Sequence, residues 1–130
     1  MAFYTGTVVQ ALRHLHKNSI LHRSIKTEAI LVDAHGYAKL GDIGFAKQLA
    51  SSTGKTYTMC GTPQYMSPEV LNGDGYGLPC DWWAVGVLLY ELLVKESPFG
   101  APNMAQTCMQ ISLHDGALPV PPGLTQGAAS

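Results

Sequence analysis

The chain has 130 residues and a mass of 13.9 kDa, which is the size of one domain. Hydrophobic residues make up 46% of it and charged residues only 13%, against roughly a quarter in ordinary globular proteins, so disordered, coiled-coil and collagen-like classes are excluded. A formal net charge of -1 supplies no basic surface for nucleic acid or an anionic membrane. So few charges suggest that a partner, or the rest of a larger domain, normally covers part of the surface.

The first half of the chain predicts a helix followed by a small β-ribbon. Residues 3–17 carry apolar side chains at helical spacing, Val8 and Leu12 among them, and the rhythm ends at Asn18. Two β-rich runs follow at 29–33 and 37–40, and the three residues between them have the length of a hairpin loop. These patterns indicate an amphipathic helix packed on one face, next to a two-stranded ribbon.

The second half predicts a long loop and two more helices. Residues 44–68 have no sustained period but many Gly, Ser, Thr and Pro residues, which is typical of a functional ordered loop. Pro79 opens an apolar helix that reaches about Val94, a shorter helix is expected at 104–113, and the tail from Leu118 is irregular. The apolar stretch 82–94 is shorter than the roughly 20 residues of a membrane span, so we expect a core helix with both tryptophans buried.

The cysteines and the N-terminus favour a reducing compartment. The first ten residues lack the basic start and apolar run of a secretory signal, so a cytoplasmic location is expected. Cys60, Cys80 and Cys108 are odd in number and include no CxxC pair, which favours structural thiols over disulfides. His14 and His16 lie two residues apart in the predicted helix and have no ligand partner at zinc spacing, so no metal cage is expected.

Five short motifs occur in an order and at a spacing that can be compared with known protein families. They are His22-Arg23-Ser24-Ile25-Lys26, Asp42-Ile43-Gly44, Gly61-Thr62-Pro63, Ser67-Pro68-Glu69 and Asp81-Trp82-Trp83-Ala84-Val85-Gly86. In this order and spacing they resemble the catalytic loop, magnesium loop, activation segment and central helix of eukaryotic protein kinases. The sequence TYTMCGTPQYMSPEV is similar to that of the cyclic-nucleotide-dependent branch of the AGC serine/threonine kinases.

The resemblance implies a fold and a domain organisation. Residues 1–120 are identified as a partial protein kinase domain, and 121–130 as an irregular tail. The Gly-rich loop, strand lysine and late helices of the family are not found in the 130 residues. The expected fold is therefore mainly α with a small β-ribbon, the C-terminal lobe of an α+β kinase-like fold without its N-terminal lobe.

Two positions depart from the family pattern in the predicted catalytic loop. Ser24 stands where the family has the aspartate that accepts the substrate's hydroxyl proton, and loss of a general base typically costs roughly 10² to 10⁴-fold in rate. Ala29 stands where the family has the asparagine that holds the second magnesium ion, and a methyl group cannot coordinate a metal. Asp42 does match the magnesium aspartate, with Ile43 in place of phenylalanine beside it.

Other matches concern the nucleotide and the transferred phosphate. Lys26 matches the lysine that contacts the phosphate, Thr62 the threonine that braces the catalytic loop, and Leu31 the floor of the adenine pocket. The family implies Mg and ATP as cofactors. Because one metal ligand and the upper lobe are missing, weak or absent binding is expected in this chain.

A further set of matches concerns peptide binding and regulation. Glu28 and Glu91 match carboxylates that accept an arginine of the substrate in the basophilic members of the family. Thr58 matches the activation-loop phosphothreonine, and Arg23 and Lys47 match two cations that hold its phosphate. A protein or peptide partner with basic residues is therefore expected, while nucleic acid and membrane are not.

Some residues admit two interpretations. Asp81 is explained equally well as the N-terminal cap of the apolar helix and as the residue that ties down the catalytic loop. Glu69 is either a surface carboxylate or the family's partner of an arginine in the late helices. His22 is expected to pack in the family's internal apolar stack.

Three hypotheses about function follow. The first is a pseudokinase that binds a peptide or a partner protein; the second is a piece of an active AGC-type kinase completed by other segments; the third is a degenerate fragment without function. Because the apolar faces that the other lobe and the late helices cover in the family would be open, poor solubility or self-association is also expected.

Overall fold

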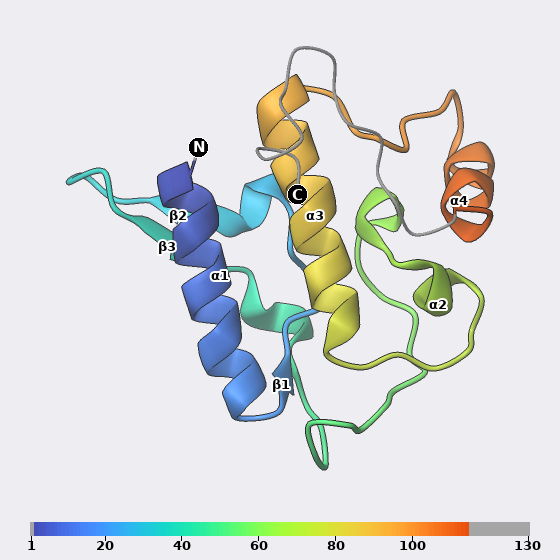
Figure 1. Cartoon of the computed structure of the whole chain (residues 1–130), viewed down its shortest axis with the longest axis horizontal. Helices are drawn as coiled ribbons and strands as arrows, with labels where there is room; N and C mark the ends of the chain where they lie inside the picture. The colour runs from blue at the N-terminus through green and yellow to red at the C-terminus, as the bar shows by residue number, and fades with distance from the viewer. Residues whose placement is uncertain (1, 115–130) are drawn as a thin grey trace.

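A computed structural model describes residues 2–114, which form a mainly α-helical fold with two small antiparallel sheets (Figure 1). The helices are α1 (Ala2–Lys17), α2 (Pro68–Leu71), α3 (Pro79–Val94) and α4 (Met104–Ser112). Three single 3₁₀ turns, η1 (Thr27–Ala29), η2 (Ile43–Phe45) and η3 (Pro63–Tyr65), lie in the connecting segments. The predicted helices and the position of the long loop are confirmed, and the predicted irregular tail from Leu118 lies outside the described residues.

The predicted ribbon consists of β2 (Ile30–Val32) and β3 (Ala38–Leu40), paired antiparallel with Leu31 opposite Lys39. The Asp33 carboxylate closes its loop by accepting hydrogen bonds from the backbone N–H groups of His35 and Tyr37, at 2.9 and 3.0 Å. A second pair, β1 (Ile20–Leu21) with β4 (Lys47–Gln48), was not predicted, because two-residue strands carry no readable alternation. This second pair ties the end of α1 to the start of the long loop.

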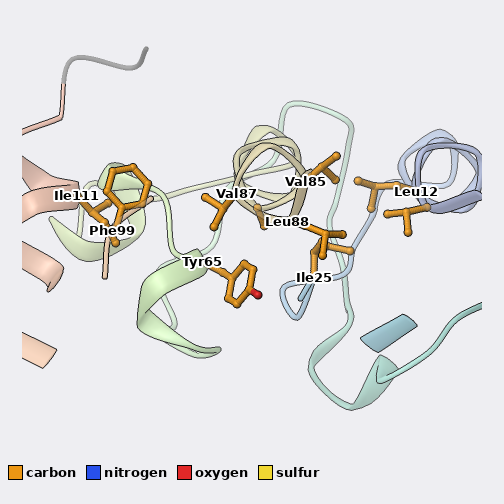
Figure 2. Packing of buried hydrophobic residues seen from close by; sticks show 10 residues of the cluster. Leu12, Ile25, Tyr65, Val85, Val87, Leu88, Phe99 and Ile111 are labelled. Carbon is orange, nitrogen blue, oxygen red and sulfur yellow. The ribbon is translucent and has the colours of Figure 1, made fainter. Parts of the chain in front are cut away.

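Helix α3 is the centre of the fold, with α1 on one side and α4 on the other (Figure 1). Pro79 suits the first turn of α3 because its missing N–H would have no helical partner there, and Lys95 ends the helix with a left-handed φ of 69°. Figure 2 shows Leu12 of α1 and Val85 of α3 packed together, while Val87 points toward Tyr65 and Ile111. Both faces of α3 are therefore buried, as its apolar sequence predicts.

One prediction about the core is wrong. Trp82 is 38% exposed, and its ring meets the His16 ring edge-on with centroids 5.5 Å apart. Trp83 does pack against the core, stacked on Phe99 at 5.7 Å. Two successive residues of a helix point about 100° apart, so a single core cannot bury both rings at this end of α3.

No helix among residues 2–114 is long and apolar enough to cross a membrane. The largest exposed apolar side chains include a group on the ribbon and the segments after it, namely Leu31, Val32, Tyr37, Ile43, Phe45, Tyr57 and Met59. None of these side chains belongs to the core around α3.

Candidate functional site

The site is built around residues 22–26, which follow β1 directly and pass beneath α3. His22 is fully buried: its Nε2 donates to the Gly41 carbonyl at 2.8 Å, and its Nδ1 accepts from the Ser24 N–H at 3.1 Å. These two bonds together require a neutral ring with its hydrogen on Nε2. His22 therefore fixes the loop through hydrogen bonds as well as through the packing that the sequence predicts.

Asp81 anchors the same loop from the first turn of α3. Its carboxylate is 1% exposed and accepts hydrogen bonds from the backbone N–H of His22 at 2.8 Å and of Arg23 at 2.9 Å. The Nε2 of His16, on α1, donates a third bond at 2.9 Å. Leu78 is the N-cap of α3 and makes no side-chain cap bond, so the helix-cap interpretation of Asp81 is wrong and the loop-anchor interpretation holds.

Arg23 occupies a left-handed conformation, with φ of 68°, which costs a non-glycine residue of order 1–3 kcal/mol unless the surroundings hold it. Here they do: its N–H is bound by Asp81, its Nε donates to the Phe45 carbonyl at 2.6 Å, and its guanidinium lies 3.3 Å from the Tyr76 hydroxyl. The backbone distortion aims Ser24 and Arg23 toward the segment that contains Asp42.

Four of the predicted site residues come together at this point. Ser24 is 5% exposed and its Oγ donates to Oδ2 of Asp42 at 2.8 Å. The ammonium of Lys26 lies 3.8 Å from the same carboxylate oxygen and donates to Thr62 Oγ1 at 3.4 Å. The cluster of Ser24, Lys26, Asp42 and Thr62 is the candidate phosphate and metal site that the sequence predicts.

Ala29 and Leu31 lie next to this cluster. Ala29 ends η1 and is 1% exposed, and its carbonyl accepts from the Gly41 N–H at 2.7 Å. Leu31, on β2, is 56% exposed, and a Cβ on Gly41 would come within 2.9 Å of its Cδ1. Leu31 is therefore an exposed apolar side chain close to Gly41, the residue before Asp42.

The two carboxylates that the sequence predicts for peptide binding, Glu28 and Glu91, lie on η1 and α3. Glu28 is exposed in η1, and Glu91 on α3 accepts a hydrogen bond from the Tyr65 hydroxyl. Burial, together with the bond to Glu91, raises the pKa of Tyr65 to about 12, while Thr27 next to Glu28 opposes this rise. Tyr65 therefore lies between Glu91 and the turn that carries Glu28.

The predicted phosphosite is only partly assembled. Thr58 is exposed, and its backbone carbonyl accepts a hydrogen bond from the Tyr76 hydroxyl, which also contacts Arg23. Lys47 donates to Thr56 Oγ1 at 2.8 Å, and Thr56 itself is buried. Arg23 is thus linked to the Thr58 backbone through Tyr76, whereas Lys47 is bonded to a neighbouring threonine.

A cavity of about 30 Å³ separates residues 23–26 from the segment 60–67. Ser67 lines it, and its buried Oγ has no hydrogen-bond partner. A space of this size holds one or two waters and is far too small for a nucleotide, which needs hundreds of cubic ångströms. Within the described residues, no group of three or more His, Cys, Asp or Glu side chains could hold a metal ion.

The three cysteines are free in the structure. Burial, aided by the neighbouring charge of Asp81, raises the pKa of the Cys80 thiol well above its usual range, which leaves it unreactive.

Glu69 is half-buried in a groove of about 420 Å³ that Lys55 and Asp74 also line.

Three site residues were missed by sequence reasoning: His16, Tyr65 and Tyr76. Each acts through a partner far along the chain, such as Asp81 for His16 and Glu91 for Tyr65. No local pattern marks such pairs, because their meeting depends on how α1, η3 and α3 pack.

Comparison with known proteins agrees with these features. The protein kinase domain family matches residues 1–120. The chain is 42% identical over 127 residues to Protein kinase 2 of Dictyostelium discoideum, covering 98% of this chain and 26% of that protein. It is 45% identical over 105 residues to the cGMP-dependent protein kinase, isozyme 1, of Drosophila melanogaster, covering 81% and 14%. It is 46% identical over 96 residues to the serine/threonine-protein kinase AtPK1/AtPK6 of Arabidopsis thaliana, covering 74% and 20%.

The chain therefore belongs to the protein kinase family. Within it, the similarity is to AGC-type serine/threonine kinases, as the motifs predict. The chain spans about a quarter or less of the length of these three relatives.

Proposed function

We propose that the chain is a catalytically impaired kinase C-terminal lobe that acts by binding a basic peptide or partner protein. The observation that carries this proposal is the state of the catalytic loop. Ser24 holds the place of the proton acceptor and donates its own hydroxyl hydrogen to Asp42, while Ala29 buries a methyl group at the place of the second metal ligand. Phosphoryl transfer needs both parts.

The acidic groups at Glu28 and Glu91 support the binding part of the proposal. An arginine forms its strongest pairs with carboxylates, through two parallel hydrogen bonds. Glu28 is exposed, and Glu91 accepts from the Tyr65 hydroxyl, which also interacts with Thr27, the residue before Glu28. The substitutions at positions 24 and 29 do not touch these residues.

Nucleotide binding is expected to be weak or absent. The adenine would rest on Leu31, which is 56% exposed, and a small ligand usually needs most of its surface buried.

Phosphorylation of Thr58 would place a negative charge near Arg23 and order the loop. The domain would act in the cytoplasm.

An active AGC-type kinase completed by other segments is the second candidate. The share of the relatives that the chain covers, 26% at most among the three described, favours it. Ser24 and Ala29 argue against it, since both would persist in the completed enzyme. A degenerate fragment without function is the third, and it predicts no specific binding at all.

A peptide titration tests the proposal. Fluorescence anisotropy would follow a labelled serine peptide with two upstream arginines, beside the same peptide with those arginines replaced by alanine. We expect the arginine peptide to bind, and Glu91→Gln or Glu28→Gln to weaken it about tenfold, the value of one charge-assisted pair. Glu96→Gln, at an exposed carboxylate after α3, is the control and should change nothing. Equal binding of both peptides would contradict the proposal.

A further inference from the structure

The residues at the family's magnesium position do not fit that ion. Mg²⁺ requires a near-octahedral set of oxygen ligands and is usually bound through one or two carboxylates. Of the two family positions, Asp42 offers a carboxylate, and Ala29 offers a methyl group that is 1% exposed. The lone carboxylate is also already engaged within the chain.

Two groups of the catalytic loop engage Asp42. The Ser24 hydroxyl donates to Oδ2 at 2.8 Å from a site that is 5% exposed, and the Lys26 ammonium lies 3.8 Å from the same oxygen. Lys26 is held in turn by Thr62, at 3.4 Å. The carboxylate therefore has a hydrogen-bond donor and a counter-charge without any bound ion.

The residue type at position 24 decides whether this arrangement needs a metal. A carboxylate there would lie within hydrogen-bonding distance of Asp42, and two ionised carboxylates at that separation repel unless a cation or a shared proton lies between them. A serine hydroxyl converts that repulsion into a donated hydrogen bond to a charged group, which is among the stronger hydrogen bonds of proteins.

The Ser24–Asp42 bond is part of a longer clasp between residues 22–26 and 41–45. His22 Nε2 donates to the Gly41 carbonyl at 2.8 Å, and Arg23 Nε donates to the Phe45 carbonyl at 2.6 Å. Between them Asp42 adopts a left-handed conformation, with φ of 55°, and makes no cap bond to the turn that it precedes. Ser24 and Lys26 are thus the groups that hold its side chain.

We propose that Ser24 takes the place of the metal ion in this chain: its hydroxyl, with Lys26, holds Asp42 and keeps the clasp closed without a divalent cation. The family's magnesium position has become an internal hydrogen-bonded cluster that does not bind the ion. This inference goes beyond peptide binding and stands whether or not a peptide binds at Glu28 and Glu91.

A manganese titration followed by electron paramagnetic resonance tests the metal side, with Mn²⁺ as the probe for Mg²⁺. The whole chain should show no saturable Mn²⁺ site that Asp42→Asn removes. Ser24→Asp should create one by supplying a second carboxylate, and adding Asp42→Asn to it should abolish that site again. Saturable binding to the unaltered chain that Asp42→Asn abolishes would overturn the proposal.

Hydrogen exchange at the backbone amides of Gly41 and Ala46 tests the clasp itself, because these N–H groups flank Asp42 and donate to the carbonyls of Ala29 at 2.7 Å and Ile43 at 3.0 Å. In the unaltered chain these amides should be protected equally with and without MgCl₂. Ser24→Ala should speed their exchange by at least about tenfold, the value of a hydrogen bond to a charged group. Ser52→Ala, which removes an exposed hydroxyl, is the control. In Ser24→Asp, exchange at these amides should be fast without divalent ions and should be slowed by Mn²⁺.

Two results would contradict the clasp. One is exchange at Gly41 and Ala46 in the unaltered chain at the rate of an unfolded peptide. The other is protection in that chain that appears only after MgCl₂ is added. Because neither readout involves a peptide, failure of this proposal is distinguishable from failure of peptide binding.

Discussion

Asp81 and Asp42 are carboxylates that contact the same five-residue loop, and they are held in different ways. Asp81 is 1% exposed and accepts from His16, His22 and Arg23. The Asp42 side chain is 41% exposed and is held by the hydroxyl of Ser24 and the ammonium of Lys26. The carboxylate that anchors the loop is buried and accepts three hydrogen bonds, whereas the carboxylate of Asp42 is partly exposed and is held by two side chains of the loop itself. We propose that the scaffold of this loop is separable from its chemistry.

The largest expected effect is loss of the Asp81 anchor. In the unaltered chain, both carboxylate oxygens of Asp81 accept hydrogen bonds, from two backbone N–H groups and a histidine. Asp81→Asn replaces one oxygen by an NH₂ group, which cannot accept and therefore faces a donor without a hydrogen bond. We expect the amides of His22 and Arg23 to exchange about a hundredfold faster, equivalent to about 3 kcal/mol. The control is Asp74→Asn, at an exposed carboxylate, and equal exchange in both variants would show that Asp81 is not the anchor.

A smaller effect concerns Tyr65, which joins the scaffold to the proposed peptide site. Its pKa is raised to about 12 in the folded chain, whereas an unfolded tyrosine titrates near 10. Its contribution to the free energy of unfolding is therefore complete below pH 10 and is lost as the pH rises from about 10 to about 12. Burial raises the pKa of Tyr76 as well, so phenolate absorbance followed against pH should show more than one late-titrating tyrosine. Tyr65→Phe should remove the one that titrates near 12.

The exposed tyrosine Tyr37 provides the control for this titration. Tyr37→Phe, at a side chain that is 62% exposed, should leave the late part of the titration unchanged. If Tyr65→Phe instead removes a tyrosine that titrates near 10, its hydroxyl is not held by Glu91 as described.

The smallest expected effect concerns the exposed apolar side chains of the ribbon and of the segments after it. They predict that the chain binds a hydrophobic dye and self-associates. Ile43→Ser combined with Met59→Ser should lower dye fluorescence measurably, while Gln10→Ser, at an exposed polar residue of α1, should leave it unchanged. A dye-silent, monomeric chain would contradict the prediction.

The sequence predicts the elements whose signals are local. Pro79 and the apolar run after it define α3, and the short gap between two β-rich runs defines the β2–β3 hairpin. The pairing of β1 with β4 joins Ile20 with Gln48, 28 positions apart, and Leu21 with Lys47, 26 positions apart, and could not be predicted from runs of two residues. Periodicity alone also could not show that Trp82 would lie at the surface.

The candidate site was predicted by motif rather than by geometry. The motifs name Ser24, Lys26, Asp42 and Thr62, and the structure brings these four together. What the motifs could not supply is the direction of each hydrogen bond: that Ser24 donates to Asp42, or that Asp81 binds the loop instead of capping its own helix. Those facts depend on the backbone turn at Arg23, which only the fold determines.

The central claim is that this scaffold persists without phosphotransfer, and the most direct test is transfer of labelled phosphate from ATP to a serine peptide with upstream arginines. In the presence of MgCl₂, the purified chain should give no incorporation above the background measured without protein. Incorporation above that background that disappears in Asp42→Ala would contradict the account, because it would show that the cluster of Ser24, Lys26 and Asp42 still performs the family's chemistry.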